Sequence, residues 1–196
     1  MEVSVKKVRT GAFAIAAVLL AACGSESTTA PDGAVMSQPA VAASRSFEPG
    51  SLGTCDSLAV PAGSHLLAHY YASGDQIYFW EGQKWLFIGP DAILYRDRAG
   101  RRQVGVHQVA GVWESKDGSK VVGQVQRSCT PSSTAIAWQL LSVLGQMGPG
   151  IFARVDAIQR IRTEGGLPPV TPGTVYGQQV RSPYRAEYLF YRVGRQ

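Results

Sequence analysis

Short apolar stretches, separated by glycine, proline and charged residues, recur along the chain from about residue 58 onward. Strands bounded by turn residues produce this pattern. The last stretch alternates clearly, because Tyr188 and Phe190 fall on one face of a strand and Glu187 and Leu189 on the other. Strands are predicted over residues 64–72, 76–80, 84–88, 91–97, 103–108, 151–162 and 185–193. The sequence therefore predicts a mainly β fold, an antiparallel β-sandwich or barrel.

Residues 135–147 depart from this pattern. Apolar side chains recur there at helical spacing, at Ile136, Leu140, Val143, Leu144 and Met147. Residues 130–134 offer hydroxyl groups that can cap a helix, and Gly148, Pro149 and Gly150 would end it. We therefore expect one α-helix, packed against the sheet through its apolar stripe.

A hairpin is predicted within residues 105–127, with Asp117 and Gly118 at its turn. A two-residue loop of type I′ needs positive φ at both positions, which Asp tolerates and Gly adopts freely. Such a loop would place Trp113 opposite Val122 on one face of the sheet. It would place Glu114 opposite Val121 on the other face.

The hairpin region resembles a family of secreted bacterial and fungal proteins, the domain of unknown function 3455 (DUF3455). The residues that carry the resemblance are His107, Gly111, Trp113, Glu114, Asp117, Gly118, Ser119, Val122 and Gly123, with Gln76, Ile77, Tyr78 and Trp85 before them, and 158–160, Thr163, 165–168, Pro183, Tyr184, Tyr188, Phe190 and Tyr191 after them. The resemblance covers about residues 60–192 and implies a β-rich secreted domain. It supplies no catalytic residues.

The first 22 residues have the character of a signal peptide. A basic segment precedes an apolar run over 11–22, which is shorter than the roughly 20 residues that span a bilayer. The run ends in Leu20, Ala21, Ala22 and Cys23, which resembles the lipobox of bacterial lipoproteins, so Cys23 is expected to carry the lipid. Gly24 follows, as in lipoproteins sorted to the outer membrane. We expect a lipid-anchored protein of the bacterial cell envelope, at the outer membrane and facing the periplasm or the cell surface.

The chain divides into three parts by composition. Residues 1–22 form the signal peptide, 23–53 a lipidated cysteine followed by a disordered linker, and 54–196 the globular domain. The linker is rich in Ser, Thr, Ala, Pro and Gly, so it cannot bury enough apolar surface to offset the cost of ordering. The two remaining cysteines, Cys55 and Cys129, are expected to form a disulfide in an exported domain. It would close a loop of about 75 residues and contribute roughly 4.5 kcal/mol in the chain-entropy model.

Charge and metal-ligand spacing narrow the function classes. The formal charge of the whole chain is +5, and no basic run exceeds Arg101 and Arg102, so no nucleic-acid partner is expected. His65 and His69 lie four residues apart, and on a strand they would be about 13 Å apart, too far to share an ion. We expect neither a metal site nor a cofactor.

Candidate chemistry gathers around the hairpin. A ligand site is hypothesised at His107, Trp113, Glu114, Gln159 and Arg160. The sequence contains no Gly-x-Ser-x-Gly motif and no phosphate-binding glycine loop. The leading interpretation is a non-catalytic envelope lipoprotein that binds a small molecule or a protein partner. Two alternatives remain open: a structural envelope protein, and a cell-envelope hydrolase that uses His107, Glu114 or Asp117.

Overall fold

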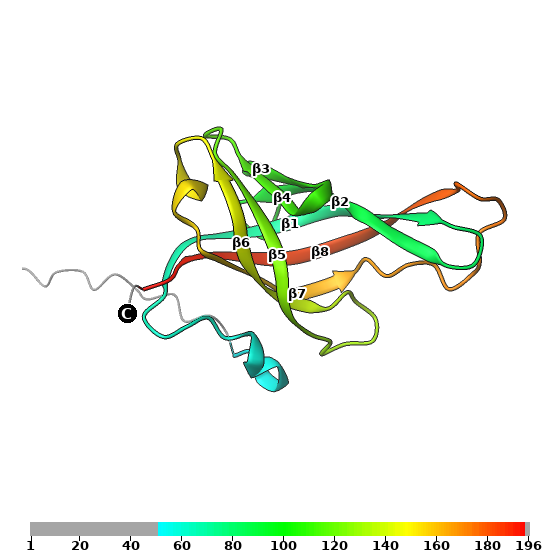
Figure 1. Ribbon diagram of the computed structural model, residues 1–196, viewed down its shortest axis with the longest axis horizontal. Helices are drawn as coiled ribbons and strands as arrows, with labels where there is room; N and C mark the ends of the chain where they lie inside the picture. Colours follow the sequence, from blue (N-terminus) through cyan, green and yellow to red (C-terminus); the bar gives the residue numbers. More distant parts are fainter. Residues whose placement is uncertain (1–50, 195–196) are drawn as a thin grey trace, which may run out of the picture. The chain divides into compact units, whose positions relative to one another are not determined.

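The computed structural model describes residues 51–194 and shows eight antiparallel strands closed into a barrel (Figure 1). The strands are β1 (His65–Trp80), β2 (Trp85–Tyr95), β3 (Gln103–Gln108), β4 (Val112–Ser115), β5 (Lys120–Cys129), β6 (Trp138–Met147), β7 (Ala157–Gly165) and β8 (Gln179–Arg192). Each strand pairs with the next, and β8 pairs with β1 to close the ring. Within the barrel itself, closure leaves no open sheet edge. The predicted β-rich class is confirmed, and the barrel is the form it takes.

Three short 3₁₀ helices complete the described residues: η1 (Gly53–Leu58), η2 (Val109–Gly111) and η3 (Ile151–Arg154). No helix within residues 51–194 is long and apolar enough to cross a bilayer. The predicted signal peptide, the lipidated Cys23 and residues 24–50 of the predicted linker lie outside the described residues.

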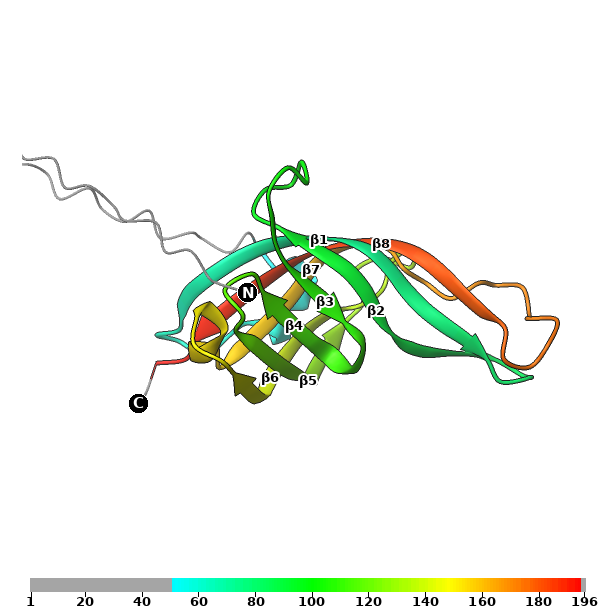
Figure 2. The same ribbon diagram turned by 90° about the horizontal axis from the view of Figure 1, so that it is seen from above.

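The strands β1 and β8 are the longest, with 16 and 14 residues, and together with β2 they continue past the barrel as an arm (Figures 1 and 2). Two pairs of strands predicted from the sequence are each one strand here, because Gly74 continues β1 and the Gly89–Pro90 step continues β2. A Cβ atom at Gly74 would lie 2.2 Å from the carbonyl oxygen of Asp91. Glycine at position 74 therefore allows close strand approach and does not mark a turn.

The predicted helix over residues 135–147 is wrong, since most of this segment is strand β6. Leu141 faces the barrel interior, whereas its neighbour Leu140 packs outside against Cys55 and Leu58. Both faces of β6 are thus covered at this point, and apolar residues occupy successive positions. Two-sided burial accounts for Leu140 beside the inward Leu141, whereas Leu144 and Met147, which completed the apparent helical spacing, are exposed.

The predicted hairpin exists, but its register differs by one residue. Trp113 lies opposite Val121, and Glu114 lies opposite Lys120. The Ser115 N–H donates to the Ser119 carbonyl at 2.9 Å, so the loop has three residues, with positive φ at Gly118. Trp113 and Val121 consequently share the barrel interior, while Glu114 and Lys120 form an ion pair outside.

The hairpin loop is fixed by contacts that lie far away in sequence. One oxygen of Asp117 accepts hydrogen bonds from the N–H and the hydroxyl of Ser119, at 2.9 and 2.6 Å. The other oxygen accepts from the N–H of Ile151 at 2.8 Å, and Ser119 Oγ accepts from the N–H of Phe152. The hairpin thereby holds η3 at one end of the barrel. The segment 151–162 was predicted as one strand, but its first four residues form η3 and only the rest enters β7.

The N-terminal segment covers the outside of the barrel and is joined to it covalently. The predicted disulfide between Cys55 and Cys129 is confirmed. Cys55 and Leu58 in η1 are fully buried against β6. Gln159 donates to the Leu58 carbonyl at 2.6 Å, so the segment also makes a buried polar contact with β7. A second apolar layer therefore lies outside the barrel, in addition to the core within it.

Candidate ligand-binding cavity

A cavity of about 500 Å³ lies in the barrel, on the side where β1 and β2 run into the arm. Its size falls within the range of roughly 300–1,000 Å³ that is usual for small-molecule sites. At the opposite end of the barrel, the interior is filled by Phe152 from η3, whose ring contacts Tyr70 and Phe190. One end is therefore packed, and the other retains space.

His107 and Trp113 form one wall of the cavity. The two residues are register partners on β3 and β4, and their rings stack at a centroid distance of 4.0 Å with an interplanar angle of 6°. Tyr188 meets both rings edge-on. Alternation along each strand directs these three side chains inward, so they meet across the lumen.

His107 is neutral in this environment. Burial lowers its pKa to about 3; the hydrogen bond to Val112 opposes this shift, and Arg160 adds to it. His107 Nδ1 lies 3.0 Å from the Val112 carbonyl oxygen. A carbonyl only accepts, so Nδ1 carries the proton and donates it.

Arg160 is the charged residue of the cavity. Its Nε and one terminal nitrogen donate to the Ala137 carbonyl at 3.1 and 2.9 Å. Among the described residues that line the cavity there is no Asp, Glu or Lys. Burial raises the pKa of Tyr78 and Tyr188, and the nearby guanidinium partly opposes this rise. The cavity therefore has a positive potential.

Three polar atoms of the lining side chains have no partner of good geometry within residues 51–194. They are Gln76 Nε2, Trp113 Nε1 and the Tyr188 hydroxyl, and all three are buried. The Tyr188 hydroxyl nevertheless lies beside Tyr184 and Arg160, which contact it, so the two nitrogens are the donors without any partner. A buried polar group without a partner costs about 1–3 kcal/mol. The Tyr78 hydroxyl differs, since it donates to the Gly166 carbonyl at 2.6 Å. A buried donor without a partner in the protein indicates a place where a bound molecule supplies the acceptor.

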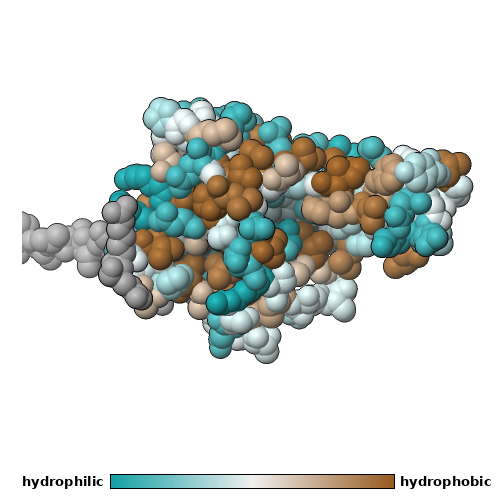
Figure 3. All heavy atoms as spheres, in the orientation of Figure 1, coloured by the Kyte–Doolittle hydropathy of each residue, from teal (hydrophilic) through white to brown (hydrophobic). Residues whose placement is uncertain are grey.

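The rest of the cavity wall is apolar and continues to the surface. Ile136 and Leu141 lie deeper, whereas Phe87, Val125 and Leu167 are 52%, 46% and 40% exposed. These last three form the rim. Hydrophobic surface extends over this face of the barrel and along the arm (Figure 3). A patch that leads into a cavity is a usual feature of binding sites.

A family model described as "Protein of unknown function (DUF3455)" matches residues 61–192. The chain belongs to the DUF3455 family. No curated protein and no solved structure matches it significantly. The resemblance stated from the motifs is thus confirmed, and it brings no activity with it.

Several residues of the DUF3455 resemblance meet at the cavity: Gln76, Tyr78, His107, Gly111, Trp113, Gly123, Arg160 and Tyr188. Gly123 has a packing role there, because a Cβ atom would lie 2.9 Å from the Trp113 ring. Gln76, Tyr78 and Tyr188 were not proposed as site residues from the sequence. Their signal was the alternation along β1 and β8, which places them on the same inward face.

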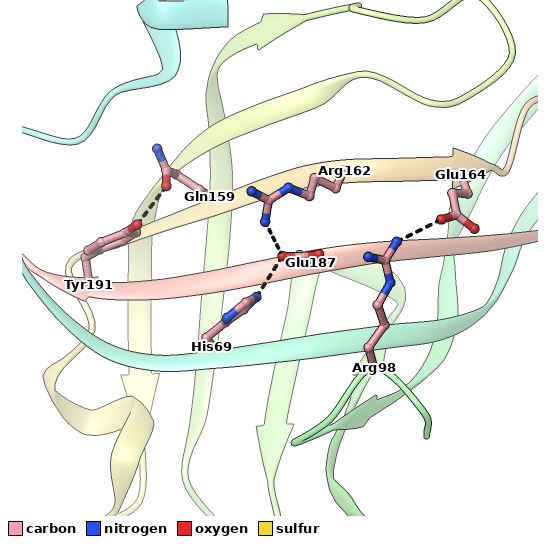
Figure 4. Close-up of polar contacts among 7 residues, drawn as sticks. All are labelled: His69, Arg98, Gln159, Arg162, Glu164, Glu187 and Tyr191. Carbon is pink, nitrogen blue, oxygen red and sulfur yellow. Dashed lines mark hydrogen bonds and ion pairs between the residues drawn. The ribbon is translucent and has the colours of Figure 1, made fainter. Parts of the chain in front are cut away.

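The structure separates the five hypothesised site residues. His107, Trp113 and Arg160 line the cavity, but Glu114 and Gln159 do not. Glu114 contacts Lys120 at 2.9 Å outside the barrel and so takes no part in the surroundings of Arg160. Gln159 is buried beneath η1, where it accepts from the Tyr191 hydroxyl at 2.9 Å (Figure 4).

The residues named for a hydrolase do not form a catalytic set. The Ser119 hydroxyl donates to Asp117, and the Ser115 hydroxyl accepts from the N–H of Asp117. Partial burial of Asp117 raises its pKa, but hydrogen bonds from Ser119, Ile151 and Ser115 outweigh that and lower it to about 2. His107 contacts the Val112 carbonyl instead of a serine. These groups build the turn and the cavity wall.

A second polar cluster lies on the outer face of β1, β7 and β8 (Figure 4). Glu187 Oε2 accepts from His69 Nε2 at 2.9 Å and from Arg162 at 2.7 Å. Burial raises the pKa of Glu187, and these two partners lower it by more. Arg162 has a φ of 48°, a left-handed conformation that is uncommon outside glycine. The cluster joins three strands on the side of the sheet away from the cavity.

Proposed function

We propose that this protein binds a small, largely apolar ligand in the barrel cavity and does not transform it. The observation that carries the proposal is the combination of space and unmet polar groups. The cavity has about 500 Å³ of room, and two lining side chains, Gln76 and Trp113, have buried donor nitrogens without partners among the described residues. A core packed only for stability fills such space and pairs such groups.

The apolar rim supports the same function. Phe87, Val125 and Leu167 remain exposed at the cavity rather than packing into the core. A ligand that covers them would remove their apolar surface from water, at about 25 cal/mol per Å². The hydrolase alternative gains no comparable support, because His107 and Asp117 have separate hydrogen-bond partners.

Titration with the uncharged fluorophore phenylnaphthylamine tests the proposal. The exported full chain carrying Cys23→Ser would be used, because this change removes the expected acylation site. We expect saturable enhancement of fluorescence with one probe per chain. Val125→Trp should abolish it by filling the rim of the cavity. Val175→Trp is the matched control, since Val175 is 62% exposed and does not line the cavity. Equal probe binding by the two variants would reject the cavity as the site.

We also propose that the domain acts at the cell envelope, tethered through a lipid on Cys23 and residues 24–53. The motif at residues 20–23 and the composition of the linker support this assignment. Incorporation of labelled palmitate into the wild-type chain, and its loss in Cys23→Ser, would test the anchor. Membrane fractionation of the same two chains would test the location at the outer membrane.

A further inference from the structure

We infer that the ligand is an amphipathic monoanion, whose carboxylate pairs with Arg160 while its apolar part reaches the rim at Phe87, Val125 and Leu167. This inference rests on the proposed function and adds the chemical class of the ligand. It joins three features: the charge of the cavity, the type of its unpaired polar groups and the position of its apolar wall.

The charge of the cavity sets the charge of the ligand. Arg160 is the one formally charged side chain among the described residues that line it, and His107 is neutral at ordinary pH. The acidic partners seen elsewhere belong to other cations, as Glu114 does to Lys120 and Glu187 to Arg162. A partly buried guanidinium without a counter-ion is unfavourable, so one negative charge in the cavity stabilises it.

The unpaired groups set the chemistry of the charged end. Gln76 Nε2 and Trp113 Nε1 have no partner among the described residues, and both are hydrogen-bond donors only. Two guanidinium nitrogens of Arg160 bind the Ala137 carbonyl, a further N–H reaches the Tyr188 hydroxyl, and the others stay available. A carboxylate only accepts and has about four lone-pair sites, so it matches this set of donors. A cation or a donor-rich ligand does not.

The apolar wall sets the direction of the ligand. Ile136 and Leu141 lie beside the polar group of residues, and Phe87 and Val125 form the exposed rim. An alkyl or aromatic body extending from Arg160 toward the rim would cover these side chains. The charged end would then be inside, and the apolar end at the mouth.

Gln139 offers a sharp test, because it lines the cavity and is the register partner of Arg160 on the neighbouring strand. Gln139→Glu has nearly the same shape and places a carboxylate beside the guanidinium. Gln124→Glu is the matched control, since Gln124 is exposed and does not line the cavity. Both variants change the net charge equally, so only the local field differs.

The assay is displacement of phenylnaphthylamine by octanoate, octanol and octylammonium. In the wild-type chain octanoate should compete at concentrations roughly 10- to 100-fold lower than octanol, as expected for one charge-assisted contact. Octylammonium should compete least. Gln139→Glu should reduce the preference for octanoate over octanol by a similar factor, with both competitors measured in the same variant, whereas Gln124→Glu should keep the wild-type preference.

Different failures point to different steps. Equal competition by octanoate and octanol in wild type would overturn the anion and leave the proposed function standing. An absence of both fluorophore and octanoate binding would overturn the two together. If Gln139→Glu does not fold, as judged by its thermal transition, Arg160→Gln replaces it. That variant removes the charge and keeps a donor for the Ala137 carbonyl, and it should make octanoate no better than octanol. A retained preference for octanoate would reject the inference.

Discussion

The burial of His107 makes the stability of the barrel depend on pH. In the folded chain burial lowers the pKa of this imidazole to about 3, against an ordinary value of 6.5. At pH values between these two, the unfolded chain binds a proton that the folded chain does not. Stability therefore falls as the pH is lowered from about 6.5 toward 3.

The size of the effect follows from linkage. Each unit of pKa difference corresponds to about 1.4 kcal/mol, so lowering the pH from about 7.5 to about 5 should cost the wild type about 2 kcal/mol through this residue. The value of about 2 kcal/mol holds as long as the pKa of His107 in the folded chain lies well below 5. Burial of the imidazole against Trp113 inside the barrel keeps the pKa that low.

Urea unfolding at the two pH values measures this cost. His107→Asn removes the titration, and its amide can still donate to the Val112 carbonyl. The variant should lose about 2 kcal/mol less than wild type between the two pH values, whatever its absolute stability. His65→Asn, at an exposed position, should retain the wild-type difference. Equal pH dependence of wild type and His107→Asn would refute the assignment of a buried, neutral imidazole.

Three further predictions concern the contacts that hold the barrel closed. Replacing Cys55 and Cys129 together by serine should lower the free energy of unfolding by about 2–5 kcal/mol, measured by urea denaturation with the disulfide-bonded wild type as reference. Ser119→Ala removes the hydroxyl that joins Asp117 to the start of η3, and should cost about 1–3 kcal/mol in the same assay; an unchanged midpoint would contradict the network. Phe152→Ala should cost about 3–5 kcal/mol, because the ring is fully buried at the closed end of the barrel, and a loss below about 1 kcal/mol would show that this end is not packed.

Much of the strand pattern could be read from local sequence, because alternation and turn residues are local signals. The strand β3 was predicted with the bounds that it has, and the last strand, predicted over 185–193, matches the second half of β8 but ends one residue too late. The hairpin at Asp117 and Gly118 was also found, but its register was not. The three-residue loop is held by hydrogen bonds that Asp117 accepts from the N–H groups of Ile151 and Ser119. Ile151 lies 34 positions away, so the residues of the turn alone do not indicate this contact.

The failed helix has a different cause. Leu140 and Leu141 are both buried because the N-terminal segment covers the outer face of β6. Nothing near these residues shows that η1 will lie there, although the disulfide from Cys55 to Cys129 was a hint that it would.

The candidate site was half predictable. Residues next to each other on a strand face opposite sides, so Trp113 and Glu114 cannot both point into one cavity, nor can Gln159 and Arg160. Once Trp113 and Arg160 are known to face the interior, strand alternation alone places Glu114 and Gln159 on the outside. The contribution of Gln76 requires the closure of the barrel, which brings β1 across from β4.

The most direct test of the ligand cavity is the indole N–H signal of Trp113 in a two-dimensional ¹H–¹⁵N NMR spectrum, recorded during titration with octanoate. The chain has four tryptophans, and the Trp113 signal can be assigned with Trp113→Phe. Trp113 lines the cavity, whereas Trp85 donates its indole N–H to the Thr171 carbonyl and Trp138 packs on the outer layer. The account predicts that the Trp113 signal moves saturably and that the Trp85 and Trp138 signals stay in place. A Trp113 signal that does not move at saturating octanoate, or movement confined to the other tryptophans, would contradict it.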